Sequence, residues 1–167
     1  MKSLGLLAGA ALLLAACATS QPEPLRISNV TAETDLAAVG SREAVSYWKS
    51  LSGDLETAIA NQFVGRIDPA GPSIHVNVDE LSLNSPFASG ATAETAVISG
   101  RVDLVSPAET TISSYDVTAH AQDVQDFLPA GTNIVSVPPT SAEYYQAVVQ
   151  GFARGVAITL EGDHGKS

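Results

Sequence analysis

The side chains best suited to chemistry lie on one alternating segment, residues 74–79. Its apolar residues alternate with His75, Asn77 and Asp79, and this period of two is typical of a half-buried strand. Alternate residues of a strand project from the same face, about 6.6–6.8 Å apart, so these three side chains share the wet face. One histidine and one carboxylate are too few for a tetrahedral zinc site. We therefore expect a solvated strand face there, without a catalytic or metal-binding role.

A second histidine, His120, falls on the outward positions of a later predicted strand. If the two strands were in register, His75, His120 and Asp79 could together bind a metal weakly. The carboxylates of Asp79 and Glu80 are adjacent, so they point to opposite faces of a regular strand and make a poor acid and base pair. We expect neither a metal nor a cofactor at these positions.

Motifs of the common enzyme classes are absent from the sequence. It contains no G-x-S-x-G elbow, no phosphate-binding loop, no G-x-G-x-x-G and no H-E-x-x-H. Ser113 and Ser114 lie within a strand pattern and not on a sharp strand-to-helix turn, which leaves a Ser/His/Asp site without a framework. The sequence therefore predicts a protein that is not an enzyme.

The single cysteine, Cys17, ends the tetrapeptide Leu-Ala-Ala-Cys at residues 14–17. Before it come Lys2 and a run of only Leu, Ala and Gly over residues 4–14, the charged and apolar regions of a signal peptide. The run is too short to cross a bilayer, which takes about 20 apolar residues. The tetrapeptide resembles the lipobox of bacterial lipoproteins.

This resemblance implies lipidation of Cys17: a diacylglyceryl group on the thiol, cleavage before Cys17, and acylation of the freed amine. Several acyl chains on one residue give stable anchoring, because each buried CH₂ contributes about 0.8 kcal/mol. Ala18 stands where Asp would favour retention in the inner membrane. We expect a periplasm-facing anchor in the outer membrane, with inner-membrane retention as the alternative.

The chain divides into four predicted parts with one folded domain. These are a signal peptide (residues 1–16), a lipidated tether (17–24), a single periplasmic domain (25–161) and a flexible tail (162–167). The chain holds 18 acidic and 8 basic residues, a net charge of −10, and loss of the signal peptide with Lys2 makes it −11. Such an acidic surface repels nucleic acid and anionic headgroups. With one cysteine, a disulfide and a cysteine-based metal or redox site are excluded as well.

A long amphipathic helix is predicted over residues 41–64, followed by Gly65 at a C′-like position. Gly53 inside it indicates either a close backbone approach or a kink. Trp48 belongs to the apolar stripe, so we assign it to the core. The stripe has spacings of three and four and consists of Ala44, Trp48, Leu51, Leu55, Ile59 and Phe63.

Strands are predicted around residues 25–30, 74–78, 96–104 and 115–121, the last three as an antiparallel meander. A bulge near residues 79–80 is expected, because the apolar positions there shift from even to odd. Gly100, in mid-strand, would leave room for a helix above it.

The last part of the chain combines a long loop and a second helix. Residues 122–139 have no clear pattern, which indicates a functional or mobile loop, with a short edge strand at 134–137 as one option. Thr140 and Glu143 form a capping box for a helix that reaches about Leu160. Small residues every fourth position on this helix pack on small strand residues or, alternatively, form a partner groove. These are Ala147, Gly151 and Gly155, facing Gly100, Ala119 and Ala121.

The expected fold class is therefore α+β: an antiparallel sheet of about four strands with two helices on one face, in the order β-α-β-β-β-α. This order resembles the ABC-type transport auxiliary lipoproteins and, more weakly, the lipopolysaccharide-assembly lipoprotein. The segments that carry the resemblance are Ile-His-Val-Asn-Val-Asp-Glu-Leu (74–81), Ile-Ser-Gly-Arg-Val-Asp-Leu (98–104) and Tyr-Tyr-Gln-Ala-Val (144–148). The first resemblance implies an outer-membrane partner of a lipid-transport complex.

Three functions follow as hypotheses. The first is a non-catalytic, lipid-anchored periplasmic accessory protein of an envelope transport or assembly complex, held by the lipid on Cys17 and by a protein partner. The second is a carrier of lipid or a small apolar ligand, which requires a cavity between helices and sheet. The third is an enzyme, for which the sequence offers no framework.

Overall fold

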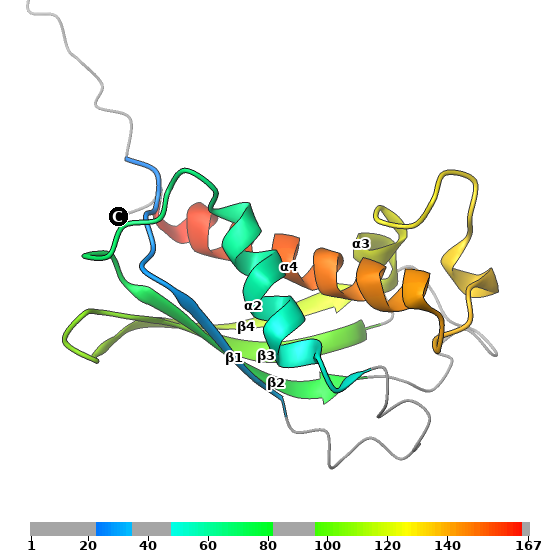
Figure 1. The fold of residues 1–167 in the computed structure, drawn as a ribbon, viewed down its shortest axis with the longest axis horizontal. Helices are drawn as coiled ribbons and strands as arrows, with labels where there is room; N and C mark the ends of the chain where they lie inside the picture. Colours follow the sequence, from blue (N-terminus) through cyan, green and yellow to red (C-terminus); the bar gives the residue numbers. More distant parts are fainter. Residues whose placement is uncertain (1–22, 35–47, 82–95, 165–167) are drawn as a thin grey trace, which may run out of the picture.

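The structure is a computed structural model that describes residues 23–34, 48–81 and 96–164. Helices pack on one face of a four-stranded sheet of order β1-β2-β3-β4, which confirms the predicted α+β fold (Figure 1). The elements are β1 (Val30–Thr34), α2 (Leu51–Gln62), β2 (Ser73–Leu81), β3 (Ala96–Val105), β4 (Thr111–His120), α3 (Ala121–Gln125), the 3-10 helix η2 (Ile134–Ser136) and α4 (Ala142–His164).

The first strand differs from the prediction in place and direction. It begins at Val30, and it pairs parallel to β2, whereas the other two pairs are antiparallel. The physical reason is α2, which lies between the two strands in the sequence, because a crossover helix returns the chain to the same end of the sheet. Leu25 and Ile27 are buried before the strand, and Ile27 forms an isolated parallel bridge with Ile67.

The predicted bulge in β2 is confirmed. Val78 pairs with Gly100 and Glu80 pairs with Ser99, so Asp79 is the extra residue. Gly100 is buried in mid-strand, and its nearest neighbours belong to the adjacent strand β2. A Cβ on Gly100 would lie 2.5 Å from the carbonyl oxygen of Asn77. The glycine lets the backbones of β2 and β3 approach each other where the bulge distorts the ladder.

Helix α2 is shorter than predicted, because residues 49–50 form a turn with Ser50 as the N-cap and the C-cap is Phe63; residues 41–47 lie outside the described ranges. Trp48 is buried, as predicted, and packs edge-on against the ring of Tyr145 with centroids 4.9 Å apart. Of the two alternatives at Gly53, the close backbone approach is wrong: the residue is exposed, and a Cβ there would meet nothing within 4 Å. Gly65 has a φ of +77°, but it lies one residue beyond the C′ position, because the C-cap is Phe63.

Residues 121–137 contain α3 and η2, so the edge strand predicted at 134–137 is wrong. The side chain of Gln125 holds this segment together. Its Nε2 donates to the carbonyl of Thr132 at 2.7 Å, and its Oε1 accepts from the N–H of Ile134 at 2.8 Å. These bonds favour compact turns, with Ile134 buried under the segment.

The N-cap of helix α4 is one residue later than predicted, and the helix continues past Leu160 to His164. The hydroxyl of Ser141 accepts from the N–H of Tyr144 at 3.2 Å, so Ser141, and not Thr140, caps the helix. An ion pair between Glu161 and Arg66, which follows α2, fixes the last turns of α4 to the rest of the domain. Helices α2 and α4 lie side by side over the sheet and enclose one apolar core (Figure 1).

Candidate functional site

Cys17 lies outside the described residues, so its lipidation stays a prediction. Within the residues that the structure describes, no helix is long and apolar enough to cross a membrane.

The open face of the sheet carries the polar residues that the sequence singled out. His75, Asn77 and Asp79 are exposed, as predicted. His120 pairs with Ala96 at the far end of β4, whereas His75 lies opposite Asp103, so the two histidines do not meet. Across the described ranges, no three His, Cys, Asp or Glu side chains are grouped to hold a metal ion.

A contact that the sequence did not predict joins Ser73 to His75, whose Oγ and Nε2 atoms are 3.1 Å apart. The only signal for it is their spacing of two along a strand. Asp103 faces His75 across β2 and β3 but accepts a hydrogen bond from the hydroxyl of Ser114. The serine and histidine of a hydrolytic triad are thus adjacent, while the carboxylate is engaged by a different hydroxyl.

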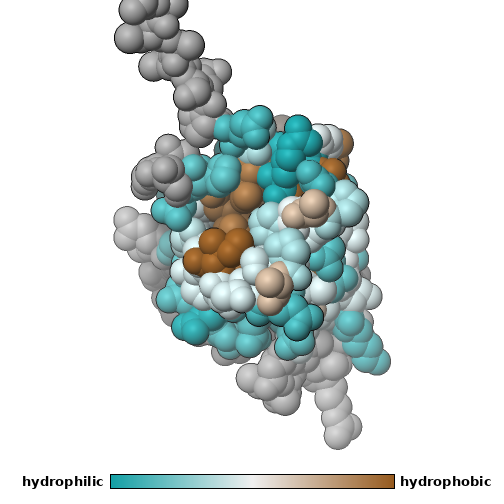
Figure 2. Space-filling view, turned by 90° about the vertical axis from the view of Figure 1, so that its left-hand side faces the viewer, coloured by the Kyte–Doolittle hydropathy of each residue, from teal (hydrophilic) through white to brown (hydrophobic). Residues whose placement is uncertain are grey.

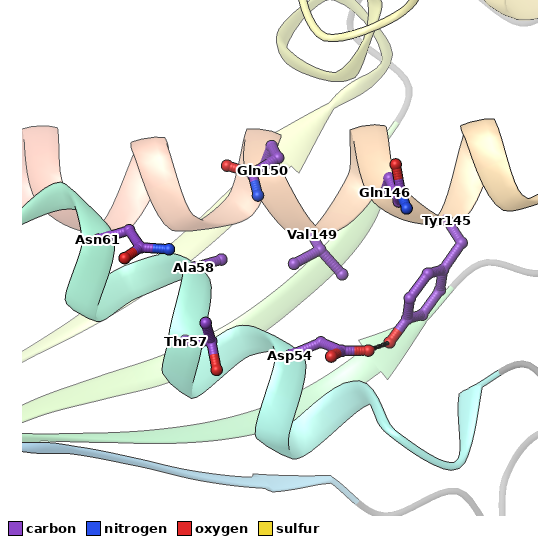
Figure 3. A pocket seen from close by; sticks show the side chains of 8 residues that line it. All are labelled: Asp54, Thr57, Ala58, Asn61, Tyr145, Gln146, Val149 and Gln150. Carbon is purple, nitrogen blue, oxygen red and sulfur yellow. Dashed lines mark hydrogen bonds between the residues drawn. The ribbon is translucent and has the colours of Figure 1, made fainter.

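A groove of about 360 Å³ runs between α2 and α4 on the outer side of the helices (Figure 3). The hydroxyl of Tyr145 donates to the carboxylate of Asp54 and so bridges the two helices at one end of the groove. Burial, together with this bond to Asp54, raises the pKa of Tyr145. The remaining lining is largely amide and hydroxyl side chains, from Thr57, Asn61, Gln146 and Gln150. Asp54 and Tyr145 are the two titratable groups of this lining, and they are bonded to each other.

A second groove, of about 500 Å³, follows the outer edge of β4; we call it the β4-edge groove. Its lining includes five consecutive strand residues, 116–120, whose side chains alternate between the two faces of the sheet. Only an edge can present both sets to one hollow, so the groove lies beside the strand and not above it. The rest of the lining comes from Asp123 and Asp126 at α3 and from Gly151, Arg154, Gly155, Ile158 and Thr159 of α4.

The outer sides of the two edge strands, β1 and β4, have different contacts. At β1, Glu56 of α2 accepts a hydrogen bond from the backbone N–H of Ala32 at 2.9 Å. The hydroxyls of Thr34 and Ser52 lie 2.9 Å apart and extend this link between strand and helix. At β4, no strand of the described ranges pairs with the outer side. An uncovered edge is a template for a further strand, so β4 is the edge that is available for pairing.

The charges of the β4-edge groove are predominantly negative. Asp116, Asp123 and Asp126 line it against one guanidinium, Arg154, which is a net charge of −2 with His120 neutral. Arg154 lies 3.1 Å from Asp126, and the His120 ring lies 3.4 Å from Asp123. Asp116 has a looser contact with Arg101, 3.7 Å away, and its side chain is 82% exposed. A cation in the groove would meet carboxylates on both sides.

The small residues of α4 shape this groove. A Cβ on Gly151 would lie 3.2 Å from the carbonyl of Asp123 in α3, and one on Gly155 would lie 3.4 Å from Cγ1 of Val117 in β4. The glycines thus bring α4 close to α3 and β4. The stripe packs inside the molecule, and its edge lines the β4-edge groove. A partner in that groove stays a prediction.

Exposed apolar side chains are few. Among the described residues, four large ones are at least half exposed: Val64 (75%), Ile67 (50%), Ile112 (59%) and Ile158 (60%). Figure 2 shows the end of the molecule that holds the α2–β2 and β3–β4 turns, where a little apolar surface is surrounded by hydrophilic surface. Scattered exposure of this kind is ordinary. Ile158 differs, because it lies in the lining of the β4-edge groove.

The comparisons with known proteins identify no family. No protein-family model matches the chain, and no curated protein matches it. A crystal structure of a chain provisionally described as a lipoprotein from Caulobacter crescentus CB15 is similar over 81% of this chain and 92% of that one. Its identity is 15% and its TM-score is 0.40, too low to carry an argument about fold or function. The resemblance to the transport auxiliary lipoproteins stays a prediction.

Proposed function

We propose that the chain is a lipid-anchored periplasmic accessory protein that docks, without catalysis, onto an envelope transport or assembly complex, with the outer membrane as its site. The observation that carries the docking is the contrast between the two sheet edges. The N–H of Ala32 within β1 is bonded to Glu56 of α2. At β4 the corresponding bond, from His120 to Asp123 of α3, lies at the last residue of the strand, and Asp116 and Thr118 border an open, acidic groove. A protein that is attached to its membrane by a lipid leaves such an edge free for a partner.

The other two functions have less support. Between helices and sheet the side chains form one buried cluster, with Trp48, Phe63, Tyr144 and Phe152 among the largest. The three hollows described along this chain lie at its surface, so a lipid would have to displace core residues. For an enzyme, Ser73 and His75 are exposed together on the open sheet face without an engaged carboxylate.

The anchor is tested with Cys17→Ser in cells. We expect the wild type to partition into the detergent phase with the outer-membrane fraction and the variant to appear in the soluble periplasm. A variant that stays in the detergent phase would contradict lipid anchoring. Recovery with the inner membrane would leave the anchor and overturn only its location.

The docking is tested with a photo-crosslinking amino acid at Thr118, on the β4 edge, in intact cells. The matched control carries the same amino acid at Glu33, on the exposed side of β1. We expect Thr118 to give a discrete crosslinked band with an envelope protein and Glu33 to give none. Equal labelling at both sites, or recovery of only the uncrosslinked monomer, would contradict the proposal.

A further inference from the structure

We infer that the β4 edge binds an extended segment of a partner protein by strand addition, and that this segment alternates basic with small apolar side chains. The inference rests on the proposed function, since the segment would belong to the partner complex. The backbone, the charges and the neighbouring helix of the β4 edge determine which side chains such a segment must carry.

The backbone of β4 presents its free groups to the groove at even-numbered residues. At the β3–β4 turn, the carbonyl of Thr110 accepts a hydrogen bond from the N–H of Ser106, on the β3 side of the same hairpin, at 2.8 Å. A bulge then shifts the register between the pairs Val105–Thr111 and Leu104–Ser113. Because one extra residue reverses the alternation, odd residues from Ser113 onward face β3 and even residues face away.

The other end of the strand leads to the same assignment. The N–H of His120 donates to the carboxylate of Asp123 in α3 at 2.8 Å, so it points away from β3. Backbone groups alternate between the two sides of a strand, which gives Asp116 and Thr118 the same outward direction as His120. Asp116 and Thr118 both line the groove, so each offers an N–H and a carbonyl to a segment lying there.

The two faces of an added strand would meet different surroundings. On the helix side lie the side chain of Ile158, which is 60% exposed, and Gly155, which takes up little space. Small apolar side chains fit there. On the other side lies the carboxylate of Asp116, which is 82% exposed and has a loose contact with Arg101, 3.7 Å away; Asp123, Asp126 and Arg154 belong to the helix side. Alternate side chains of a strand project to opposite faces, so the complementary segment alternates small apolar with basic residues.

A second copy of this chain is a poor occupant. Each chain has a net charge of −10, and β4 paired with β4 would place Asp116 near its equivalent. Like charges facing each other across strands are destabilising. The charge pattern therefore favours a different, basic partner segment over self-association.

The experiment uses the full chain in detergent with a labelled peptide of five Lys-Val repeats as the probe. Binding is followed by fluorescence anisotropy, and the binding site by hydrogen exchange. We expect protection of amides in residues 114–118 and binding that weakens as salt rises. A peptide of five Glu-Val repeats has the same backbone and should bind at least tenfold more weakly.

Thr118→Pro removes the outward N–H while leaving the ladder to β3 intact, a substitution that edge strands tolerate. We expect it to weaken Lys-Val binding by up to about tenfold, as the loss of one hydrogen bond implies. Thr118→Val is the matched control, because it keeps the N–H, and it should stay within twofold of the wild type. Hydrogen exchange of β3 verifies that Thr118→Pro remains folded.

The charge is tested by Asp116→Lys, with Glu33→Lys as a control for the same change of charge on the other edge. Asp116→Lys should weaken binding about fivefold, and Glu33→Lys should leave it within twofold.

Strand addition at β4 would be overturned by equal effects of the two charge variants, by unchanged binding of the peptide to Thr118→Pro, or by protection of amides elsewhere than in β4. A concentration-dependent dimer with β4 amides protected in the absence of peptide would replace the partner by a second copy. If the peptide does not bind while Thr118 still crosslinks to an envelope protein in cells, only the segment chemistry is wrong and the docking function stands.

Discussion

The carboxylate of Glu56 in α2 accepts a hydrogen bond from the backbone N–H of Ala32 in β1, over 2.9 Å and 24 residues of sequence. This bond ties the crossover helix to the edge strand that it follows in the sequence. It also occupies a donor that would otherwise be free at the sheet edge.

Glu56→Ala should lower the free energy of unfolding by about 1–2 kcal/mol, because a part-buried donor loses its acceptor. Urea denaturation with circular dichroism measures this. Glu56→Gln keeps an acceptor at the same place and should lose less than half as much. If both variants were as stable as the wild type, the bond would not contribute to holding the edge.

Gly100→Ala and Gly53→Ala should have effects of opposite sign. A Cβ on Gly100 would lie 2.5 Å from the carbonyl oxygen of Asn77 and 3.0 Å from Cα of Val78, so the backbones of β2 and β3 must separate. We expect a loss of about 2–4 kcal/mol. At Gly53 a Cβ meets nothing within 4 Å on an exposed helix position, and alanine should add up to about 1 kcal/mol. Thermal unfolding of the pair is the measurement, and a stable Gly100→Ala would refute the close approach.

Tyr144 should make stability fall at alkaline pH. Its side chain is 0% exposed, and burial raises its pKa to about 12 from 10.0. The folded chain then keeps a proton that the unfolded chain releases above pH 10, so stability is lost as pH rises from 10 to 12. The loss at pH 11 is about 1.4 kcal/mol for this group. Urea unfolding between pH 8 and 11 measures it.

Tyr144→Phe should remove that part of the pH dependence. Its hydroxyl has no hydrogen-bond partner among the described residues, so at pH 7 the substitution should be neutral or stabilising by up to about 1 kcal/mol. Tyr145→Phe is the contrast, since it loses the bond to Asp54 and should destabilise by about 1 kcal/mol. A wild-type slope in Tyr144→Phe would show that other groups cause the alkaline loss.

His75→Ala should leave both stability and cellular function within error of the wild type. The side chain is exposed and its hydrogen-bond partner is Ser73, also on the sheet's open side. Growth under envelope stress and the melting temperature are the two measurements. A loss of function in a fully folded His75→Ala protein would favour an enzyme and count against a non-catalytic role.

Local patterns in the sequence predicted much of the fold. Alternation assigned His75, Asn77 and Asp79 to the wet face, and the shift in parity located the bulge before Glu80. The three-and-four spacing assigned Trp48 to the core. These features depend on which face of a strand or helix is buried, and the spacing of apolar and polar residues along the sequence indicates that face.

The sequence also carries the prediction at Cys17, which depends on a local motif and needs no fold. The composition limits the partners, since a net charge of −10 disfavours nucleic acid and anionic lipid surfaces. These conclusions come from covalent chemistry and charge, and they are independent of the way in which the strands pair.

Only the tertiary structure decided the β4-edge groove and the covering of β1. Asp116, Asp123 and Arg154 belong to three separate elements, and their meeting depends on how α3 and α4 pack beside the sheet. The parallel direction of β1, the neighbour of Gly100 and the acceptor for Ala32 likewise arise from contacts between segments distant in sequence. Local periodicity tells which face of an element is buried, but it does not tell which edge is left without a neighbour.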